Sequence, residues 1–255
     1  MAVELSYKEN AAILVLNRPE ALNALSFAII EEIGKALDDV ARSDARVLLV
    51  TGAGDKSFCA GADIKELRNR DLMAQKRGAA IGQTTFSKIE ALPMPSVALI
   101  NGYAFGGGLE IALACTFRLA APQAKMGLPE IKLGLIPGYG GTQRLPRLIG
   151  ETRALELIMT GRTVEADEAL NIGLVNQIFE GDPLDAGFAF AKDFTGFSLP
   201  ILEFARQAVT RASDSPIHEG LKIEADLSTL AFRTGDAEEG MAAFEEKRKP
   251  EFKDA

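Results

Sequence analysis

The apolar positions in the first fifty residues predict a β-hairpin, a helix and a buried strand, in that order. Val3 to Lys8 and Ala12 to Asn17 form the expected hairpin, because apolar residues alternate or run together on either side of a polar pair. An apolar period of helical spacing then extends from the N-cap candidate Ser26 to about Ala41. Arg46 to Thr51 is short, apolar and β-branched, as expected for a buried strand. Strands that alternate with helices in this way indicate an α/β fold.

The same alternation continues to about Leu145, and the sequence beyond it is mainly helical. Pro95 to Ile100 and Phe117 to Ala121 predict two more short strands, and Arg70 to Leu92 predicts a polar, mobile segment followed by a helix. One further extended segment is expected at Leu174 to Phe179. The later helices are expected at residues 152–160, 165–171, 183–194, 200–213, 217–232 and 236–247.

No Pro/Gly/Ser-rich spacer divides the chain, although its composition becomes more helical near residues 195–200. We therefore expect a core with the active site over residues 1–197 and a helical oligomerisation region over residues 198–255. Apolar residues in that region, which a chain of this size need not bury alone, favour a homo-oligomer. Examples are Leu221, Leu227, Leu230 and Phe232.

Composition and charge narrow the classes of function. The 255 residues are 47% hydrophobic and 25% charged, which is an ordinary balance for a globular protein with a sizeable core. The formal net charge of −8 argues against broad binding to nucleic acid or to anionic membranes. No apolar run reaches the roughly 18 residues of a membrane span, and the N-terminus lacks secretory or transit features. These features favour a cytoplasmic protein, or one that is already processed.

Several familiar kinds of site are disfavoured by residue spacing. Cys59 and Cys115 are too few for a disulfide framework and have no metal-ligand spacing, so we expect reduced packing residues. The single histidine, His218, has no GxSxG partner and is expected to be solvated or to cap a helix. The segment Gly52 to Ser57 resembles parts of a dinucleotide fingerprint and of a P-loop, but it lacks the third glycine of the first and the glycine before lysine of the second.

The strongest candidate for chemistry is the segment Asn101 to Cys115, where three glycines open an apolar helical run. The first amides of a helix have no intrahelical partner and favour an anion or a developing oxyanion. Glycines at this position let a ligand approach those amides closely. Glu110 lies three residues after Gly107, on the same helix face. Its carboxylate either complements the helix dipole or, among apolar neighbours, has a raised pKa suited to proton transfer.

Two other segments supply candidate partners for this helix start. Phe58 to Asp63 contains mostly small residues, so it either lets another backbone amide approach a ligand or is a tight loop before a helix capped by Asp63. Met126 to Arg144 is rich in glycine and contains one acidic residue, Glu130. Glu130 alone is typical of a solvated turn, but with Glu110 it forms a possible acid–base pair.

Four motifs together resemble the enoyl-CoA hydratase (crotonase) family, and the likeness runs from about Val3 to Lys253. The motifs are FCAGADIKEL at 58–67, NGYAFGGGLE at 101–110, GLPEIKLGLIPGYGGTQRLPRLIG at 127–150 and ALNIGLVNQI at 169–178. The resemblance implies a crotonase-like α/β spiral of ββα units with a C-terminal helical trimerisation region. It also implies a homohexamer, built as a dimer of trimers, that acts on an acyl-CoA thioester without a separate cofactor.

The resemblance also implies roles for individual residues. Ala60 and Gly107 match the family's oxyanion-hole amides, and Glu110 and Glu130 match its two catalytic glutamates. Gly138 matches a glycine whose amide lies near the catalytic water. Positions that match the CoA and thioester path are Ala21, Leu22, Ala62, Asp63, Ile64, Tyr103 and Pro129, with Phe252 and Lys253 near the adenine.

The activity implied is reversible hydration of a trans-2-enoyl-CoA to a 3-hydroxyacyl-CoA. The nearest alternative is a Δ3-Δ2-enoyl-CoA isomerase, but relatives of that kind usually have an apolar residue at one of the two glutamate positions. A more remote alternative is an RNA-binding relative, which would carry a lysine-rich early helix, whereas residues 27–43 are rich in acids. One departure concerns Glu20, which stands where relatives often have a phosphate-binding lysine. Lys56 or the C-terminal cations Lys247, Arg248 and Lys253 of a neighbouring subunit are candidates to replace it.

Overall fold

Parallel strands with covering helices make up the first of two units in the computed structural model, which describes residues 1–255. This first unit contains residues 1–92 and 96–189. The second contains residues 93–95 and 190–255. The predicted alternation of strands and helices therefore belongs to the first unit, and the second is almost entirely helical.

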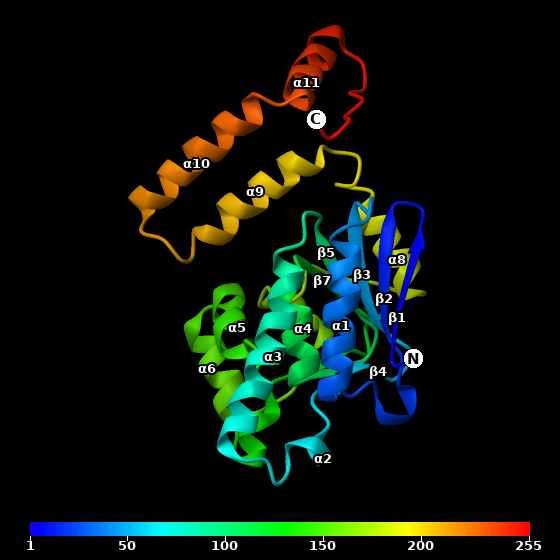
Figure 1. Cartoon of the computed structure of the whole chain (residues 1–255), viewed down its shortest axis with the longest axis vertical. Helices are drawn as coiled ribbons and strands as arrows, with labels where there is room; N and C mark the ends of the chain where they lie inside the picture. The colour runs from blue at the N-terminus through cyan, green and yellow to red at the C-terminus, as the bar shows by residue number, and fades with distance from the viewer. The chain divides into compact units, whose positions relative to one another are not determined.

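A six-stranded sheet forms the centre of the first unit (Figure 1). Its order is β1-β2-β3-β5-β7-β10, and every neighbouring pair is parallel except the predicted β1-β2 hairpin. The strands are β1 (Val3–Lys8), β2 (Ala11–Leu16), β3 (Val47–Gly52), β5 (Ser96–Ile100), β7 (Phe117–Ala120) and β10 (Gln177–Ile178). All residues of β3 and β5 are buried, which explains their continuous apolar sequences.

A second, four-stranded sheet was not predicted from the sequence. Its order is β4-β6-β8-β9, formed by β4 (Ser57–Cys59), β6 (Tyr103–Phe105), β8 (Lys125–Gly127) and β9 (Val164–Glu165). These strands have two or three residues each, too few for a recognisable alternation of apolar and polar positions. The sheet matters for the site because β4 and β6 run parallel and bring the two segments that follow them together.

Two long helices cover one face of the large sheet and pack against each other (Figure 1). They are α1 (Phe27–Val40), capped by Ser26 as predicted, and α3 (Leu72–Glu90). The helix predicted within Arg70 to Leu92 begins earlier than expected, because α3 begins at Leu72 with Asp71 as its N-cap and so includes most of the polar start of this segment. The polar residues there lie on the exposed face of a continuous helix. On the other side of the sheet, Gly187 of α8 (Pro183–Ala191) packs on side chains of β3 and β5.

Shorter helices complete the first unit. These are η1 (Pro19–Ala21), α2 (Ile64–Leu67), α4 (Gly107–Ala114), η2 (Pro129–Leu133), α5 (Gly141–Ile149), α6 (Glu151–Thr160) and α7 (Ala166–Asn171). Helix α5 was not predicted, since it starts at a glycine and contains Pro146. Cys59 and Cys115 are free and buried, as expected. Burial raises the pKa of each thiol to about 12.

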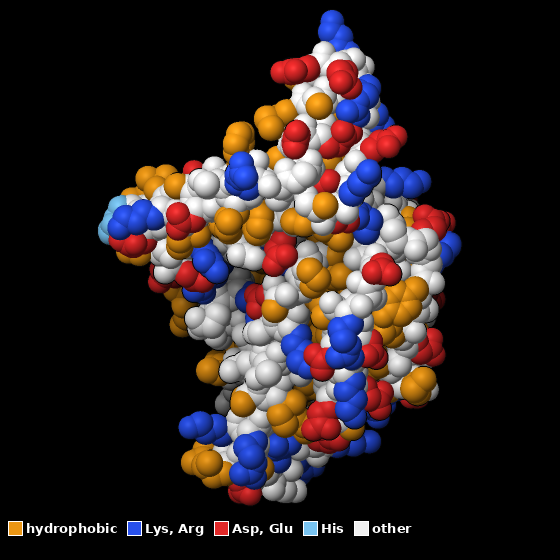
Figure 2. All heavy atoms as spheres, turned by 45° about the horizontal axis from the view of Figure 1, so that its top comes forward, with side chains coloured by type: hydrophobic (Ala, Val, Ile, Leu, Met, Phe, Trp, Pro, Cys, Tyr) orange, Lys and Arg blue, Asp and Glu red, His pale blue; other side chains and the backbone are white.

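Three helices, α9 (Leu199–Arg211), α10 (Ile217–Phe232) and α11 (Gly235–Glu246), form the second unit. The buried carboxylate of Asp236 accepts hydrogen bonds from the amides of Lys253 and Asp254, which fixes the chain end against α11. The second unit leaves several large apolar side chains exposed. Figure 2 shows hydrophobic side chains along the α10 segment that begins near the exposed histidine. They include Ile217, Leu221, Leu230 and Phe232, all more than half exposed.

None of these helices is both long and apolar enough to pass through a bilayer.

Candidate active site

The predicted helix start is built where β6 runs into α4. Gly106 has a φ of 50° and turns the chain from the strand into the helix, whose eight residues are all buried. A Cβ at Gly108 would overlap the carbonyl oxygen of Cys59, so only glycine lets α4 come this close to the end of β4. The glycine sequence thus serves close packing of two backbones as well as access to the helix amides.

Glu110 projects from the first turn of α4 into a buried space and is fixed there by backbone amides. The residue is 1% exposed. Its Oε1 atom accepts hydrogen bonds from the Tyr139 amide at 2.7 Å and from the Gly141 amide at 2.8 Å. Burial raises the pKa of Glu110 above its ordinary value, while these two amides and the charge of Arg144 oppose the rise. The carboxylate is therefore held in one position, and its pKa is raised.

Glu130 reaches the same helix start from η2, which begins at Pro129. A Cβ at Gly106 would lie 2.9 Å from Glu130 Oε1, so this carboxyl group lies against the turn that opens α4. Its Oε2 atom is buried and has no hydrogen-bond partner. Burial, with a smaller contribution from the negative charge of Glu110, raises the pKa of Glu130 to about 7. A carboxyl group with this pKa is partly protonated at neutral pH.

The amides of the two predicted oxyanion-hole residues differ in their hydrogen bonds. Gly107 is the first residue of α4, so its amide has no intrahelical acceptor and is open to a ligand. The amide of Ala60 donates to the Leu22 carbonyl oxygen at 3.0 Å. The two segments are adjacent, because a Cβ at Gly61 would lie 3.6 Å from the Gly107 nitrogen. A ligand oxygen placed at Gly107 would compete with Leu22 for the Ala60 amide.

The predicted CoA-path residues near Ala60 lie along two paired segments. Leu22 follows η1 with a φ of 52°, and Ala62 forms a β-bridge with Leu25. Asp63 is the N-cap of α2, as the alternative interpretation of this segment expected, and it also accepts a hydrogen bond from Arg18 at 3.1 Å. The Arg18 hydrogen bond, more than its charge, holds the pKa of Asp63 below its usual range. The site therefore contains an ion pair that the sequence did not predict.

The remaining predicted residues are distributed around this centre. Ala21 ends η1, Ile64 begins α2 and is half-exposed, and the ring of Tyr103 packs on that of Phe105. A Cβ at Gly138 would meet no atom within 4 Å, so open space lies beside it. Its carbonyl accepts a hydrogen bond from Gln83 of α3.

Phe252 and Lys253 belong to the second unit. There the Phe252 ring packs near that of Phe197, with ring centroids 6.5 Å apart. The Lys253 amide donates to Asp236 at 2.7 Å.

Three residues with roles at the site were not identified from the sequence. The amides of Tyr139 and Gly141 hold Glu110. Arg144 supports the same loop, because its guanidinium donates to the Tyr139 carbonyl at 2.9 Å and pairs with Glu90 of α3 at 2.6 Å. The available signal was the Gly140-Gly141 pair, which opens α5 with amides that lack intrahelical partners.

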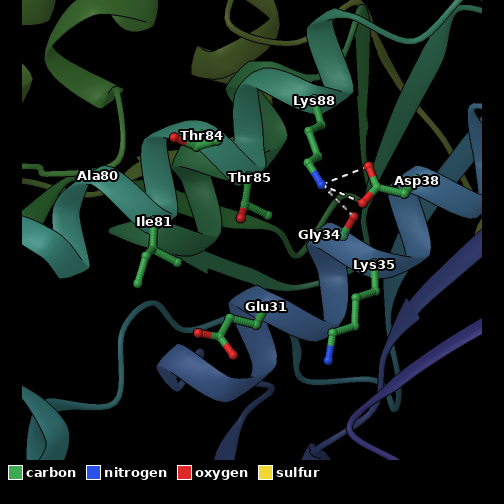
Figure 3. Close-up of a pocket in the computed structure, with 9 residues that line it drawn as sticks. All are labelled: Glu31, Gly34, Lys35, Asp38, Ala80, Ile81, Thr84, Thr85 and Lys88. Carbon is green, nitrogen blue, oxygen red and sulfur yellow. Dashed lines mark hydrogen bonds and ion pairs between the residues drawn. The ribbon is translucent and has the colours of Figure 1, made fainter.

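A separate hollow of about 420 Å³ lies between α1 and α3 (Figure 3). Glu31, Lys35 and Asp38 line it from α1, and Lys88 of α3 donates to Asp38 at 2.7 Å across it. Lys88 also donates to the Gly34 carbonyl at 3.1 Å. None of the lining residues belongs to the glutamate site. Lys88 and Asp38 neutralise each other, and Glu31 and Lys35 are exposed.

Comparison with known proteins identifies the family. The sequence profile of the family described as enoyl-CoA hydratase/isomerase matches residues 7–255. The chain belongs to this family. The match includes the segments that carry Ala60, Gly107, Glu110 and Glu130, so the four motifs in the sequence led to the correct family.

Individual members of the enoyl-CoA hydratase/isomerase family are similar to this chain over nearly its whole length. A crotonyl-CoA hydratase from Syntrophomonas wolfei is 43% identical, with 97% of this chain and 96% of that protein covered. A short-chain-enoyl-CoA hydratase from Clostridium acetobutylicum is 39% identical, with 98% and 96% covered. The crystal structure of an enoyl-CoA hydratase from Bacillus anthracis has 38% identity and a TM-score of 0.95, with both chains fully covered. These structural neighbours confirm the expected crotonase-like α/β fold.

Proposed function

We propose that this family member hydrates trans-2-enoyl-CoA thioesters with Glu110 and Glu130 as its acid–base pair. The observation that carries the proposal is the meeting of two carboxyl groups of raised pKa at one helix start. Raised pKa values in a buried site are suited to proton transfer near neutral pH. The hydratase names of similar proteins support the same reaction.

The thioester oxygen would bind at the amides of Gly107 and Ala60. Negative charge develops on this oxygen as water attacks C3, and a preorganised donor stabilises that charge most in the transition state. The free Gly107 amide supplies the first hydrogen bond. The Ala60 amide supplies the second when it turns from the Leu22 carbonyl to the substrate, so we expect the Gly107 contribution to be the larger.

The two glutamates would then complete the addition of water. Glu110 accepts a proton from water as the water oxygen bonds to C3. Glu130, protonated at the start, gives its proton to C2, and the C2=C3 π bond becomes the new C–O and C–H bonds. The hydrogen bonds from Tyr139 and Gly141 leave Glu110 Oε2 as the oxygen that faces water. Open space beside Gly138 leaves room for that water.

The CoA portion would follow the paired segments on either side of the Ala62 bridge. The path comprises Ala21, Leu22, Ala62, Asp63, Ile64, Tyr103 and Pro129. Lys56 lies beside Leu22 and Pro19 at a small hollow of about 50 Å³. We assign Lys56 as the cation that contacts the CoA phosphate in place of the lysine that Glu20 replaces. Phe252 and Lys253 of a neighbouring subunit would contact the adenine.

The helical region of residues 198–255 would join subunits into a hexamer, a dimer of trimers. Its support is the set of exposed apolar side chains on α10, because large apolar patches on soluble proteins mark interaction sites. Sedimentation should then give a single species near six times the 27.3 kDa of the chain. A stable monomer at micromolar concentration contradicts this assignment. As a soluble acyl-CoA enzyme, the hexamer would act in the cytoplasm.

The experiment that tests the catalytic pair replaces each carboxyl group by an amide of the same shape. Glu110→Gln and Glu130→Gln should each lower kcat for a short trans-2-enoyl-CoA by at least about 10²-fold, with substrate binding little changed. The double variant should lose far less than the product of the two effects, because the two groups serve one transition state. Glu151→Gln, at an exposed position in α6, is the matched control and should retain full activity.

An isomerase would give a different result with the same variants. A single carboxylate would shuttle its proton, so one substitution would be nearly silent while migration of a 3-enoyl double bond continued. Near-normal hydration by either single variant removes the paired-glutamate mechanism. Retention of RNA by the wild-type protein at low salt, dependent on RNA sequence, would favour the remote RNA-binding alternative.

A further inference from the structure

The side chain of Tyr139 fills a narrow space beside the catalytic helix. Tyr139 is 8% exposed. A Cβ at Gly82 of α3 would overlap its ring, so the ring rests directly on the α3 backbone. Phe86, one turn further along α3 and fully buried, meets the ring edge-on with centroids 5.7 Å apart. Glycine at position 82 thus makes room for this aromatic ring.

The opposite side of the same ring faces the start of α4. A Cβ at Gly107 would lie 3.2 Å from Tyr139 Cδ2 and 3.3 Å from Cε2, and 3.3 Å from the Leu25 side chain. The ring therefore spans the space from α3 to the residue whose amide binds the thioester oxygen.

The backbone amide of Tyr139 positions Glu110, and Glu110 in turn determines where C3 of the substrate lies. Its amide holds Glu110 Oε1 at 2.7 Å, and Glu110 must contact the water that attacks C3. In the proposed complex, the thioester carbon C1 lies at Gly107 and C3 lies near Glu110. The acyl carbons beyond C3 would therefore enter the space next to the Tyr139 ring. We propose that Tyr139, supported by Gly82 and Phe86, closes the acyl pocket and makes this site specific for short-chain enoyl-CoA substrates; this inference rests on the proposed hydratase function.

The ring has little freedom to move aside for a longer chain. The α3 backbone at Gly82 blocks one direction, and the Phe86 edge and the Gly107 backbone limit two others. Close-packed interiors resist such displacement because neighbouring groups already occupy the available volume. Chain length is therefore limited by the shape of one side chain, whereas the catalytic contact of the same residue is made by its backbone and survives substitution.

The test compares Tyr139→Ala with Tyr139→Phe on purified full-length protein. The readout is the ratio of kcat/KM for trans-2-decenoyl-CoA to that for crotonyl-CoA, measured for each enzyme by loss of enoyl absorbance. Tyr139→Ala should raise this ratio by at least about 10-fold, the lower end of the discrimination that a hydrophobic pocket achieves per methylene. Tyr139→Phe keeps the ring and should leave the ratio within about threefold of wild type.

Tyr139→Leu provides a second variant in case the alanine variant does not fold, and its ratio should lie between those of wild type and alanine. An unchanged or lower ratio in folded Tyr139→Ala or Tyr139→Leu overturns the inference. Equal use of crotonyl and decenoyl substrates by the wild-type enzyme also overturns it. Failure of the wild-type protein to hydrate any chain length would instead overturn the proposed function, so the two failures are distinguishable.

Discussion

The surroundings of Glu110 and Glu130 differ in a way that suits the two opposite tasks we propose for these residues. Glu110 is on a buried helix, and two backbone amides donate to one of its oxygens. Glu130 is on a short 3₁₀ turn, and its buried Oε2 has no donor at all. Burial raises both pKa values, but donors to the carboxylate oppose the rise chiefly at Glu110. Glu110, which accepts hydrogen bonds from two amides, is therefore suited to act as the base, and Glu130, with one oxygen that has no partner, is suited to act as the acid.

The two glutamates also differ in whether their surroundings fix the position of the carboxyl group or its protonation state. The amides of Tyr139 and Gly141 fix where the Glu110 carboxylate lies, and they favour its charged form. At Glu130, burial and, to a smaller extent, the negative charge of Glu110 favour the neutral form and outweigh the hydrogen bond from the residue's own amide. A substitution that changes the surroundings of one glutamate should therefore shift the pKa of that glutamate and leave the pKa of the other unchanged.

The largest loss of turnover is expected from a substitution at Gly107, at the helix start that lies next to both glutamates. In Gly107→Val, the added atoms must displace the Tyr139 ring and Leu25 and would block the helix amide that we propose as the donor to the thioester oxygen. Turnover should fall by on the order of 10²-fold to 10³-fold or more, the scale for loss of one oxyanion donor. Steady-state hydration with circular dichroism measures activity and fold together. Gly196→Val is the matched control, because no atom lies within 4 Å of its Cβ position and the residue lies outside the proposed oligomerisation region. Unchanged turnover in Gly107→Val would remove the oxyanion assignment.

A smaller effect on kcat, together with a shift in the pKa of Glu110 alone, is expected when Arg144 is replaced. Arg144→Met removes the hydrogen bond to the Tyr139 carbonyl and a positive charge that lowers the pKa of Glu110. The base then ionises at higher pH, so the acid limb of the kcat profile should move upward. We also expect kcat to fall about tenfold, since misplacement of catalytic groups costs up to about 10²-fold.

The alkaline limb provides the internal control for that variant. It reports loss of the proton on Glu130, whose pKa is about 7, and activity should decline above this pH in both proteins. Movement of the alkaline limb with an unchanged acid limb would mean that Arg144 acts on the other glutamate.

The smallest effect concerns stability, and it tests Glu130 independently of turnover. A folded-state pKa of about 7, against an ordinary value of 4.5, means that the folded protein binds the extra proton between these pH values. The free energy of unfolding therefore falls as pH rises through this window. Glu130→Gln removes the buried charge and should raise Tm at pH 8 by a few degrees relative to wild type. At pH 4 the difference should nearly vanish, and an equal difference at both values would argue against the raised pKa.

The sequence predicted the elements that display regular hydrophobic patterns and the two acidic residues. It predicted β3, β5 and α4 because buried strands and helices have long apolar runs, and it selected Glu110 because a carboxyl group is rare in such a run. The family comparison confirmed the resemblance that the glycine-rich motifs indicated.

The sequence could not predict the parts of the site that depend on backbone groups or on very short elements. The second sheet was missed because β4 and β6 have three residues each. The amides that hold Glu110 belong to residues 139 and 141, and any residue except proline supplies an amide, so residue type carries no signal for them. The role of Arg144 likewise depends on which distant segment its long side chain reaches.

The open space beside Gly138 bears on how this enzyme could acquire new reactivity. Side chains at Gly106 or Gly108 would collide with neighbouring atoms, whereas one at Gly138 would meet nothing within 4 Å. Most random changes at the helix start would therefore be lost with the fold, while changes at Gly138 would add groups beside the proposed position of the catalytic water. In directed evolution, saturation at this single codon offers a route to a different nucleophile or stereochemical outcome that the scaffold can tolerate.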